Sequence, residues 1–262
     1  MKNIGLILFD IDGVIRSVEN SYRLSLKKTV YKFSGWEPSY QDIDSAKNEG
    51  IWNNDWDLSL ELIKRHLKKK NLNLEAPSRE DIVQCFEKFY FGKNSNKESN
   101  EWSGFITNEE LLVDKTFFDI LSNNGIIWGF VSGAEFASAK FILEKRLKLN
   151  SPPLISMGDA PDKPNPQGFI DLSKKLLGEN FGPSNFPIAY VGDTIADIKT
   201  VINARQKIPT QKFISIGIAP PHLHIKSRLE ERNSYEKNLK EAGADLILNS
   251  VYDLTNINLD LF

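Results

Sequence analysis

The chain has 262 residues, of which 40% are hydrophobic and 26% charged, a composition typical of a globular protein with a sizeable core. Its 33 basic and 35 acidic residues give a formal net charge of −2, which does not indicate a nucleic-acid partner. A single cysteine, Cys85, excludes a disulfide framework and a cysteine zinc cluster, and its place in a helical pattern predicts a buried thiol.

The apolar N-terminal run is predicted to be a strand and not a targeting segment. Residues 4–9 (IGLILF) are continuous and short, and Asp10 and Asp12 interrupt them before any cleavage-site pattern. The sequence contains no run of 18 apolar residues, the length that a membrane helix requires. We therefore expect a cytoplasmic protein without a membrane partner, and both monomer and homodimer stay open.

Residues 18–105 are predicted to form a helical insertion. They are rich in Trp, Lys and Asn and show helical apolar stripes without a clear buried strand. The stripes occupy 21–33, 57–70 and 79–91, and the polar stretch 92–100 predicts a loop. The core would then comprise residues 1–17 and 106–262. The basic run at 63–70 is typical of a solvated helix face, the alternative being a grip on an anionic substrate.

The remainder of the chain alternates short apolar runs with helical patterns. The runs occupy 126–131, 154–157, 188–191, 213–218 and 245–248. The helical patterns occupy 109–123, 134–149, 166–178 and 194–206. This alternation predicts an α/β fold, a doubly wound parallel sheet with helices on both faces.

Charged and polar residues gather where the predicted strands end, which is where parallel sheets bind ligands. These residues are Asp10, Asp12, Ser132, Gly133, Asp193 and Asp197, with Lys163 in a nearby loop. A turn or helix cap would explain one aspartate and Gly13, but not a second acidic pair at another strand end. Carboxylates that are brought together repel unless a cation joins them. The pattern therefore predicts a site for a hard cation such as Mg²⁺, a common partner of phosphate substrates.

Four stretches resemble the motifs of the haloacid dehalogenase-like hydrolases. FDIDGVI resembles the DxDG motif, VSGAEF the strand-end Ser or Thr, DKPNP the Lys followed by Pro, and GDTIADI the GDxxxD motif. They occur in the family's order over residues 7–198. The resemblance implies a Rossmann-like core, with the insertion as the helical C1-type cap of subfamily I.

The resemblance also implies a role for each catalytic position. Asp10 would be the nucleophile that forms an aspartyl-phosphate, and Asp12 the general acid and then the base. Ser132 and the backbone N–H of Gly133 would hold the phosphoryl oxygens. Lys163 would neutralise charge on the nucleophile and the transferring group.

A magnesium site is implied at the same strand ends. The ion would be held by Asp10, by the backbone carbonyl of Asp12 and by Asp193. Asp197 would lie at the edge of this metal site and orient a metal-bound water or Lys163.

The resulting prediction is a Mg²⁺-dependent phosphatase that acts on a small phosphorylated metabolite. An acid at Asp12 favours phosphoryl transfer over dehalogenation, but cap lysines (Lys27, Lys28 and Lys32) leave a phosphonate-cleaving branch open. A sugar-phosphate phosphomutase and a non-catalytic binding protein are further alternatives. Loss of a motif residue would support the binding protein, and none is lost.

The cap segment EGIWNNDWDLSLELI gives the only indication of substrate. Trp52, Asn53 and Asn54 would suit a sugar or polyol, since indole faces and amide groups bind hydroxylated rings and chains. The structural alternative is a core tryptophan and a loop, followed by a helix that Asp55 or Asp57 caps.

A second unusual segment covers residues 219–235. His222 and His224 are two apart, as in a metal pair, but no third ligand is evident nearby. The other interpretation is a loop at the rim of its strand, next to the active site or in contact with a partner.

Overall fold

The computed structural model describes residues 5–47, 49, 52, 54–71, 75–92, 102–182 and 186–257. The chain divides into two compact units, which we call the core unit (Met1–Ser17 with Glu110–Phe262) and the inserted unit (Val18–Glu109). The expected boundary at 105/106 lies four residues before this division. Those residues group with the inserted unit, where the Glu109 carboxylate accepts hydrogen bonds from the Ser21 and Tyr90 hydroxyls.

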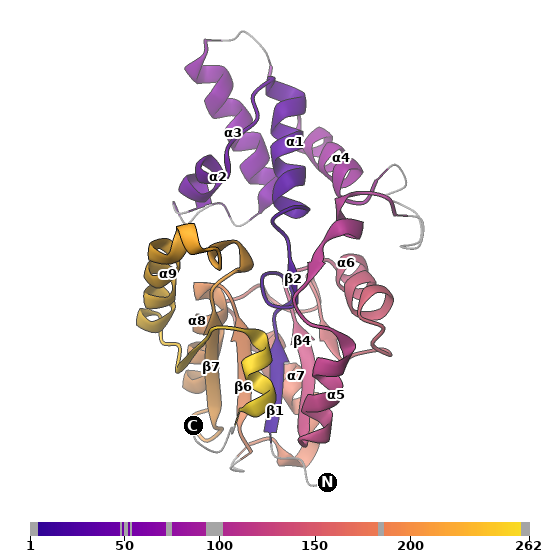
Figure 1. Cartoon of the computed structure of the whole chain (residues 1–262), viewed down its shortest axis with the longest axis vertical. Coiled ribbons are helices and arrows are strands. Elements are labelled where there is room, and N and C mark those ends of the chain that lie inside the picture. Colours follow the sequence, from indigo (N-terminus) through magenta and orange to yellow (C-terminus); the bar gives the residue numbers. More distant parts are fainter. Residues whose placement is uncertain are drawn as a thin grey trace. The chain divides into compact units, whose positions relative to one another are not determined.

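The core unit is built on a six-stranded parallel sheet of order β5-β4-β1-β6-β7-β8 (Figure 1). The strands are β1 (Gly5–Phe9), β4 (Ile126–Val131), β5 (Leu154–Ile155), β6 (Ile188–Gly192), β7 (Phe213–Ile218) and β8 (Leu246–Leu248). From β1 the chain builds the sheet outward through β4 and β5, and then returns to build the other side from β6. The predicted doubly wound parallel sheet is confirmed.

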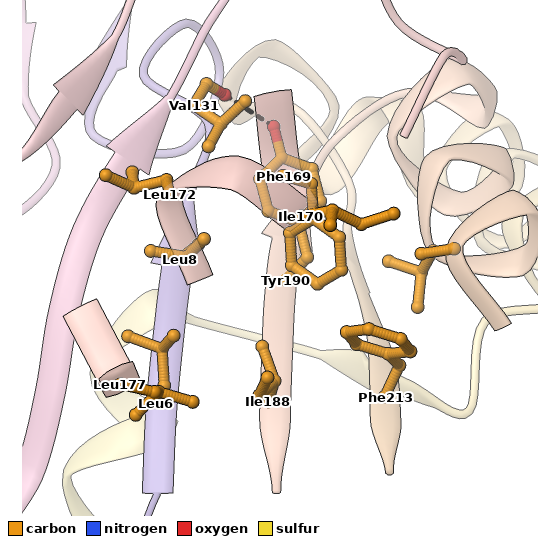
Figure 2. Packing of buried hydrophobic residues seen from close by; sticks show 12 residues of the cluster. Leu6, Leu8, Val131, Phe169, Ile170, Leu172, Leu177, Ile188, Tyr190 and Phe213 are labelled. Carbon is orange, nitrogen blue, oxygen red and sulfur yellow. Dashed lines mark hydrogen bonds between the residues drawn. The ribbon is translucent and has the colours of Figure 1, made fainter. Parts of the chain in front are cut away.

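Helices cover both faces of the sheet, which explains why the sequence of β1 is an unbroken apolar run. On one face, side chains such as Leu8 and Tyr190 pack with α7 (Gln167–Leu177) and α8 (Ile195–Lys207) in a single cluster (Figure 2). Successive strand residues point to opposite faces, so Phe9 packs on the other face. Its ring contacts Phe117 and Phe118 of α5 (Lys115–Asn123) at 5.9 and 6.0 Å between centroids.

Two predicted helices of the core unit differ clearly from the observed elements. The helix expected from 109 begins at 115, because the Asp114 carboxylate caps it by accepting the Phe117 N–H. Residues Glu110–Leu111 form instead β3, antiparallel to β2 (Arg16–Ser17). The helix expected over 134–149 is α6 (Phe136–Lys140) followed by a π-helix, η3 (Phe141–Arg146).

The strand expected over 154–157 is limited to Leu154–Ile155. Ser156 leaves the ladder because its N–H and hydroxyl both donate to the Asp159 carboxylate. A local turn therefore replaces the last two residues of the predicted strand.

Short helical turns and one longer helix connect β7 to β8 in the C-terminal part of the core unit. Between β7 and β8 lie η5 (Pro221–Leu223), η6 (Lys226–Arg228) and α9 (Leu229–Glu241). Two further short helices are η4 (Gly178–Asn180), which follows α7, and η7 (Val251–Asn256), which follows β8. Helix α9 is anchored by Leu239, which packs with Ile198 and Ala244. The segment 219–235 is therefore turns and the start of a helix, and not an open loop.

In its described residues, the inserted unit contains α1 (Tyr22–Ser34), α2 (Tyr40–Lys47), α3 (Asp55–Lys69), α4 (Arg79–Tyr90) and η2 (Phe105–Asn108). The sequence predicted three of these helices and missed α2, which buries only Ile43 and Ala46 and so has almost no apolar stripe. Cys85 on α4 is half-buried, less than predicted, and burial raises the pKa of its thiol. The predicted loop at 92–100 lies outside the described residues from position 93 onward.

Within the described ranges, no helix has both the length and the apolar character needed to cross a membrane.

Shortening one side chain of the central strand β1 should show how strongly the stability of the core unit depends on packing around its sheet. Leu8 is fully buried, so Leu8→Ala should lower the free energy of unfolding by about 2–5 kcal/mol in urea denaturation. Leu229 is 57% exposed, and Leu229→Ala should change it by less than about 0.5 kcal/mol. Equal unfolding midpoints for the two variants would contradict this packing.

Candidate active site

Asp10 is the first residue after β1, at the carboxyl edge of the sheet. Its N–H donates to the Val191 carbonyl (2.9 Å), which ties the end of β1 to β6. The side chain is buried, with Oδ2 at 3.1 Å from Lys163 Nζ. Its other oxygen, Oδ1, is buried and accepts no hydrogen bond. Burial raises the pKa of Asp10 to about 6, and the Lys163 ammonium acts in the opposite direction.

Two further carboxylates meet Asp10, Asp193 from the turn after β6 and Asp197 from the first turn of α8. Each of the three residues contributes one carboxylate oxygen to a group whose members all lie within 4.8 Å of one another: Asp10, Asp193 and Asp197. Burial, reinforced by the carboxylates of Asp197 and Asp10, raises the pKa of Asp193 well above its usual range. The three groups therefore repel one another and are stable together only with positive charge nearby.

Two glycines make this close approach possible. A Cβ on Gly13, whose φ is +79°, would lie 2.0 Å from Asp193 Oδ2. A Cβ on Gly192 would lie 2.2 Å from the Cβ of Asp197. Only a turn was predicted at Gly13, because its contact with Asp193 joins segments that are distant in the chain. Gly192 was not singled out, although its contact with Asp197 spans only five residues.

Asp197 is the most constrained of the three carboxylates. It is fully buried, and its Oδ2 accepts from the N–H and hydroxyl of Thr194, which forms the capping box of α8. Its Oδ1 lies 2.5 Å from Lys163 Nζ. Because donors occupy both oxygens, the contacts favour the predicted role of orienting Lys163 over direct metal binding.

A divalent cation fits this chemistry. Asp10 offers a buried carboxylate oxygen without a hydrogen-bond partner, and Asp193 offers a second carboxylate beside it. All-oxygen ligands of this kind are those of Mg²⁺. Asp10 and Asp193 are the side chains that would hold it. The predicted ligation by the backbone carbonyl of Asp12 stays a prediction.

The Asp12 carboxylate does not join the acidic group in this conformation. Its Oδ1 accepts a hydrogen bond from Arg16 Nε at 2.6 Å. Arg16 is 1% exposed, whereas the side chain of Asp12 is 36% exposed. Sequence reasoning missed Arg16, although its spacing of four from Asp12 was visible.

Ser132 and Gly133 follow β4 on the other side of β1. Ser132 is buried, and its hydroxyl accepts from the Ala134 N–H. At Gly133 an added Cβ would meet nothing within 4 Å, so its backbone borders open space. A cavity of about 30 Å³ is lined by both residues and by Lys163. The structure thus brings together six predicted positions: Asp10, Ser132, Gly133, Lys163, Asp193 and Asp197.

Two of the predicted substrate residues of the cap, Trp52 and Asn54, have structural partners within the inserted unit. Asn54 is the N-cap of α3, and its Oδ1 accepts from the N–H groups of Trp56 and Asp57. Asp55 and Asp57, the expected caps, lie inside the helix. Trp52 Nε1 donates to Glu49 at 2.9 Å. Asn53 lies outside the described residues, and substrate binding by all three residues of this segment stays a prediction.

The two histidines of the unusual segment show no metal-site geometry. His224 Nε2 lies 2.8 Å from the Ala219 carbonyl oxygen, a local turn contact. In the described part of the chain, neither His222 nor His224 belongs to a cluster of metal-ligating side chains. The segment instead leads into α9, where the Tyr235 hydroxyl donates to the Asp193 carbonyl (2.8 Å). This support of Asp193 was not predicted.

Comparison with known proteins assigns the chain to a family. Residues 4–205 match the profile of the haloacid dehalogenase-like hydrolases. The chain belongs to this family. It is also 30% identical, over 244 residues, to a protein of Phytophthora nicotianae named imidazoleglycerol-phosphate dehydratase. The match covers 92% of the chain and 49% of that protein, so the chain spans about half the length of this relative.

Solved structures of the haloacid dehalogenase-like fold resemble this chain along most of its length. The phosphatase Tt82 of Thermococcus thioreducens superposes with a TM-score of 0.62 at 20% identity, covering 90% of this chain and 99% of that one. A Thermotoga maritima protein, whose assignment as a β-phosphoglucomutase is inferred, superposes with a TM-score of 0.60 at 14% identity. This match covers 96% of this chain and 97% of that one. At these identities the likeness establishes the shared fold.

Removal of one carboxylate should relieve repulsion and abolish metal binding. In metal-free buffer, Asp193→Asn should raise the Tm by a few degrees, because a buried like charge is lost. Adding Mg²⁺ should raise the Tm of the wild type but not that of the variant, as thermal unfolding would show. Asp119→Asn, an exposed site on α5, is the control and should leave both values unchanged. An undiminished Mg²⁺ shift in Asp193→Asn would argue against this ligand.

Proposed function

We propose that this hydrolase is a Mg²⁺-dependent phosphatase of a small phosphomonoester that works through an aspartyl-phosphate. The observation that carries the proposal is the environment of Asp10. One oxygen of its buried carboxylate faces an ammonium, and the other is without a hydrogen-bond partner. Such an oxygen is available for attack on phosphorus or for a metal ion.

In the first half of the reaction, a carboxylate oxygen of Asp10 attacks phosphorus and the bond from phosphorus to the ester oxygen breaks. The leaving alcohol takes a proton from Asp12. For this step the Asp12 carboxyl must leave Arg16, its partner in this conformation. Lys163 stabilises the negative charge that accumulates on the transferring group. Ser132 and the Gly133 N–H hold its oxygens.

In the second half, water attacks the phosphorus of the aspartyl-phosphate and Asp12 takes the proton of that water. Inorganic phosphate leaves and the Asp10 carboxylate is regenerated. When bound, Mg²⁺ supplies positive charge that offsets the repulsion between the phosphoryl oxygens and the acidic group.

The substrate class that we favour is a phosphorylated sugar or polyol. Support comes from the indole and amide groups at Trp52, Asn53 and Asn54, and from the name of the P. nicotianae relative, which denotes a phosphorylated polyol carrying imidazole. The match covers about half of that relative, so its dehydratase activity is not transferred to this chain.

The contacts of two cap lysines weigh against the phosphonate-cleaving alternative. Lys27 and Lys28 lie 3.4 and 2.9 Å from the Glu37 carboxylate, and Lys27 also lies over the Tyr40 ring. An amine that forms an imine must lose its proton, which such pairing opposes. A phosphomutase stays the second candidate, favoured by the fold shared with the T. maritima protein.

A phosphate-release screen tests the proposal. The panel should hold sugar phosphates, polyol phosphates including imidazoleglycerol phosphate, and phosphonates, each with Mg²⁺ or with EDTA. We expect release only with Mg²⁺ from one small group of esters, and none with Asp10→Asn. Asp119→Asn is the matched control and should be fully active. Activity that survives EDTA or Asp10→Asn would refute the mechanism, and conversion of a sugar phosphate to an isomer would favour the mutase.

The cap segment calls for separate variants. If Asn54 only caps α3, then Asn54→Ala should cost about 1 kcal/mol of stability while Asn54→Asp retains it. If Asn54 and Trp52 also contact substrate, then Asn54→Asp and Trp52→Ala should raise KM several-fold for the preferred ester. Unchanged kcat and KM for every active ester in both variants would remove this segment from the substrate site.

A further inference from the structure

Tyr190, in the middle of β6, carries a hydroxyl group that touches three of the four sequence motifs. The residue is 1% exposed, and its ring lies in the apolar cluster beneath the site, edge-on to Phe169 at 5.5 Å (Figure 2). Apolar packing thus fixes the ring, and the ring carries its hydroxyl to the carboxyl edge of the sheet. Tyr190 was not among the predicted site residues.

The hydroxyl proton of Tyr190 has two acceptors within reach, of which Asp197 Oδ1, at 3.4 Å, is the more distant. The proton is donated to the carbonyl oxygen of Val131 at 2.6 Å, the last residue of β4 and the one before Ser132 (Figure 2). A carbonyl oxygen can only accept, so this bond fixes the direction of the O–H group. Burial raises the pKa of Tyr190 well above its usual range, so the phenol keeps this proton.

The hydroxyl oxygen then accepts from Lys163. Nζ of Lys163 lies 3.2 Å from this oxygen, 3.1 Å from Asp10 and 2.5 Å from Asp197. An ammonium has three N–H donors, and these are the three acceptors that the described residues present to it. The phenol, unlike the two carboxylates, is neutral, so its bond orients the ammonium without reducing its charge.

We propose that Tyr190 is a positioning residue, which fixes the Lys163 ammonium against Asp10 and links it to the backbone that precedes Ser132. This inference rests on the proposed function for its catalytic consequence. Without the hydroxyl, one N–H of the Lys163 ammonium, whose side chain is 16% exposed, and the Val131 carbonyl would both lose a partner. Lys163 would then sample other directions, and its stabilisation of the transition state would weaken more than substrate binding would.

Tyr190→Phe removes the hydroxyl and preserves the ring. We expect kcat to fall roughly tenfold, the scale of one hydrogen bond to a charged group, with KM within about twofold of the wild type. The Lys163→Met variant should retain a measurable residual turnover. Adding Tyr190→Phe to that variant should not lower kcat further, because the ammonium that Tyr190 positions is already gone. A purely structural tyrosine would lower activity equally in both backgrounds.

Tyr90→Phe is the matched control. Tyr90 is also 1% exposed, and its hydroxyl also bonds to a buried group, Glu109 of the inserted unit. Both variants should lose a few degrees of Tm, but only Tyr190→Phe should lose kcat. A Tyr190→Phe enzyme with wild-type kcat, or equal losses of kcat in the two variants, would overturn the proposal.

A readout on the ammonium itself separates this inference from the proposed function. The ¹H–¹⁵N signal of a lysine ammonium persists only where its protons exchange slowly with water. We expect such a signal from Lys163 in the wild type, its disappearance in Lys163→Met, and faster exchange in Tyr190→Phe. A wild-type Lys163 ammonium that exchanges as fast as surface lysines would overturn the positioning role even if Tyr190→Phe does not fold. A protected signal in a protein without phosphatase activity would refute the proposed function alone.

Discussion

The ammonium of Lys163, held between Asp10 and Asp197, is the interaction on which the rest of the site depends. Three buried carboxylates and one ammonium carry a formal charge of −2 among them (three negative, one positive), which an apolar interior does not tolerate by itself. The fold keeps them together with capping bonds and with glycines that allow close approach. The charge that remains is what a divalent cation would offset, so the arrangement is strained without one and suited to one.

The parallel sheet supplies the geometry for this charge cluster. Asp10, Ser132 and Asp193 follow three neighbouring strands, and the carboxyl ends of β4, β1 and β6 lie along one edge. Each strand is buried on both faces, so its last residue cannot move without disturbing the core. Tyr190 extends this principle, because its ring belongs to the core and its hydroxyl belongs to the site. The site thereby inherits the rigidity of the sheet.

Much of the fold and the site could be predicted from sequence, and the limits are physical. Apolar runs identify strands because a covered parallel sheet tolerates few polar residues, and the charges that end those runs mark the site. Contacts between distant segments left no comparable signal. The bonds of Tyr190 to Val131 and of Tyr235 to Asp193 join residues 59 and 42 positions apart. Helix α2 and the start of α5 depend on short polar segments, where side-chain capping outweighs apolar periodicity.

The two units also differ in what their residues reveal about function. In the core unit, Asp10 has a buried oxygen without a hydrogen-bond partner, so part of its bonding capacity remains for a ligand. In the inserted unit, Asn54 caps α3 and Trp52 bonds to Glu49, so local structure already accounts for both. An unused buried polar atom is costly and calls for an explanation, and Trp56 Nε1 of the inserted unit is another such atom, but the Asp10 carboxylate also faces an ammonium and two further carboxylates. The chemistry that we propose for this hydrolase therefore rests on the residues of its core unit.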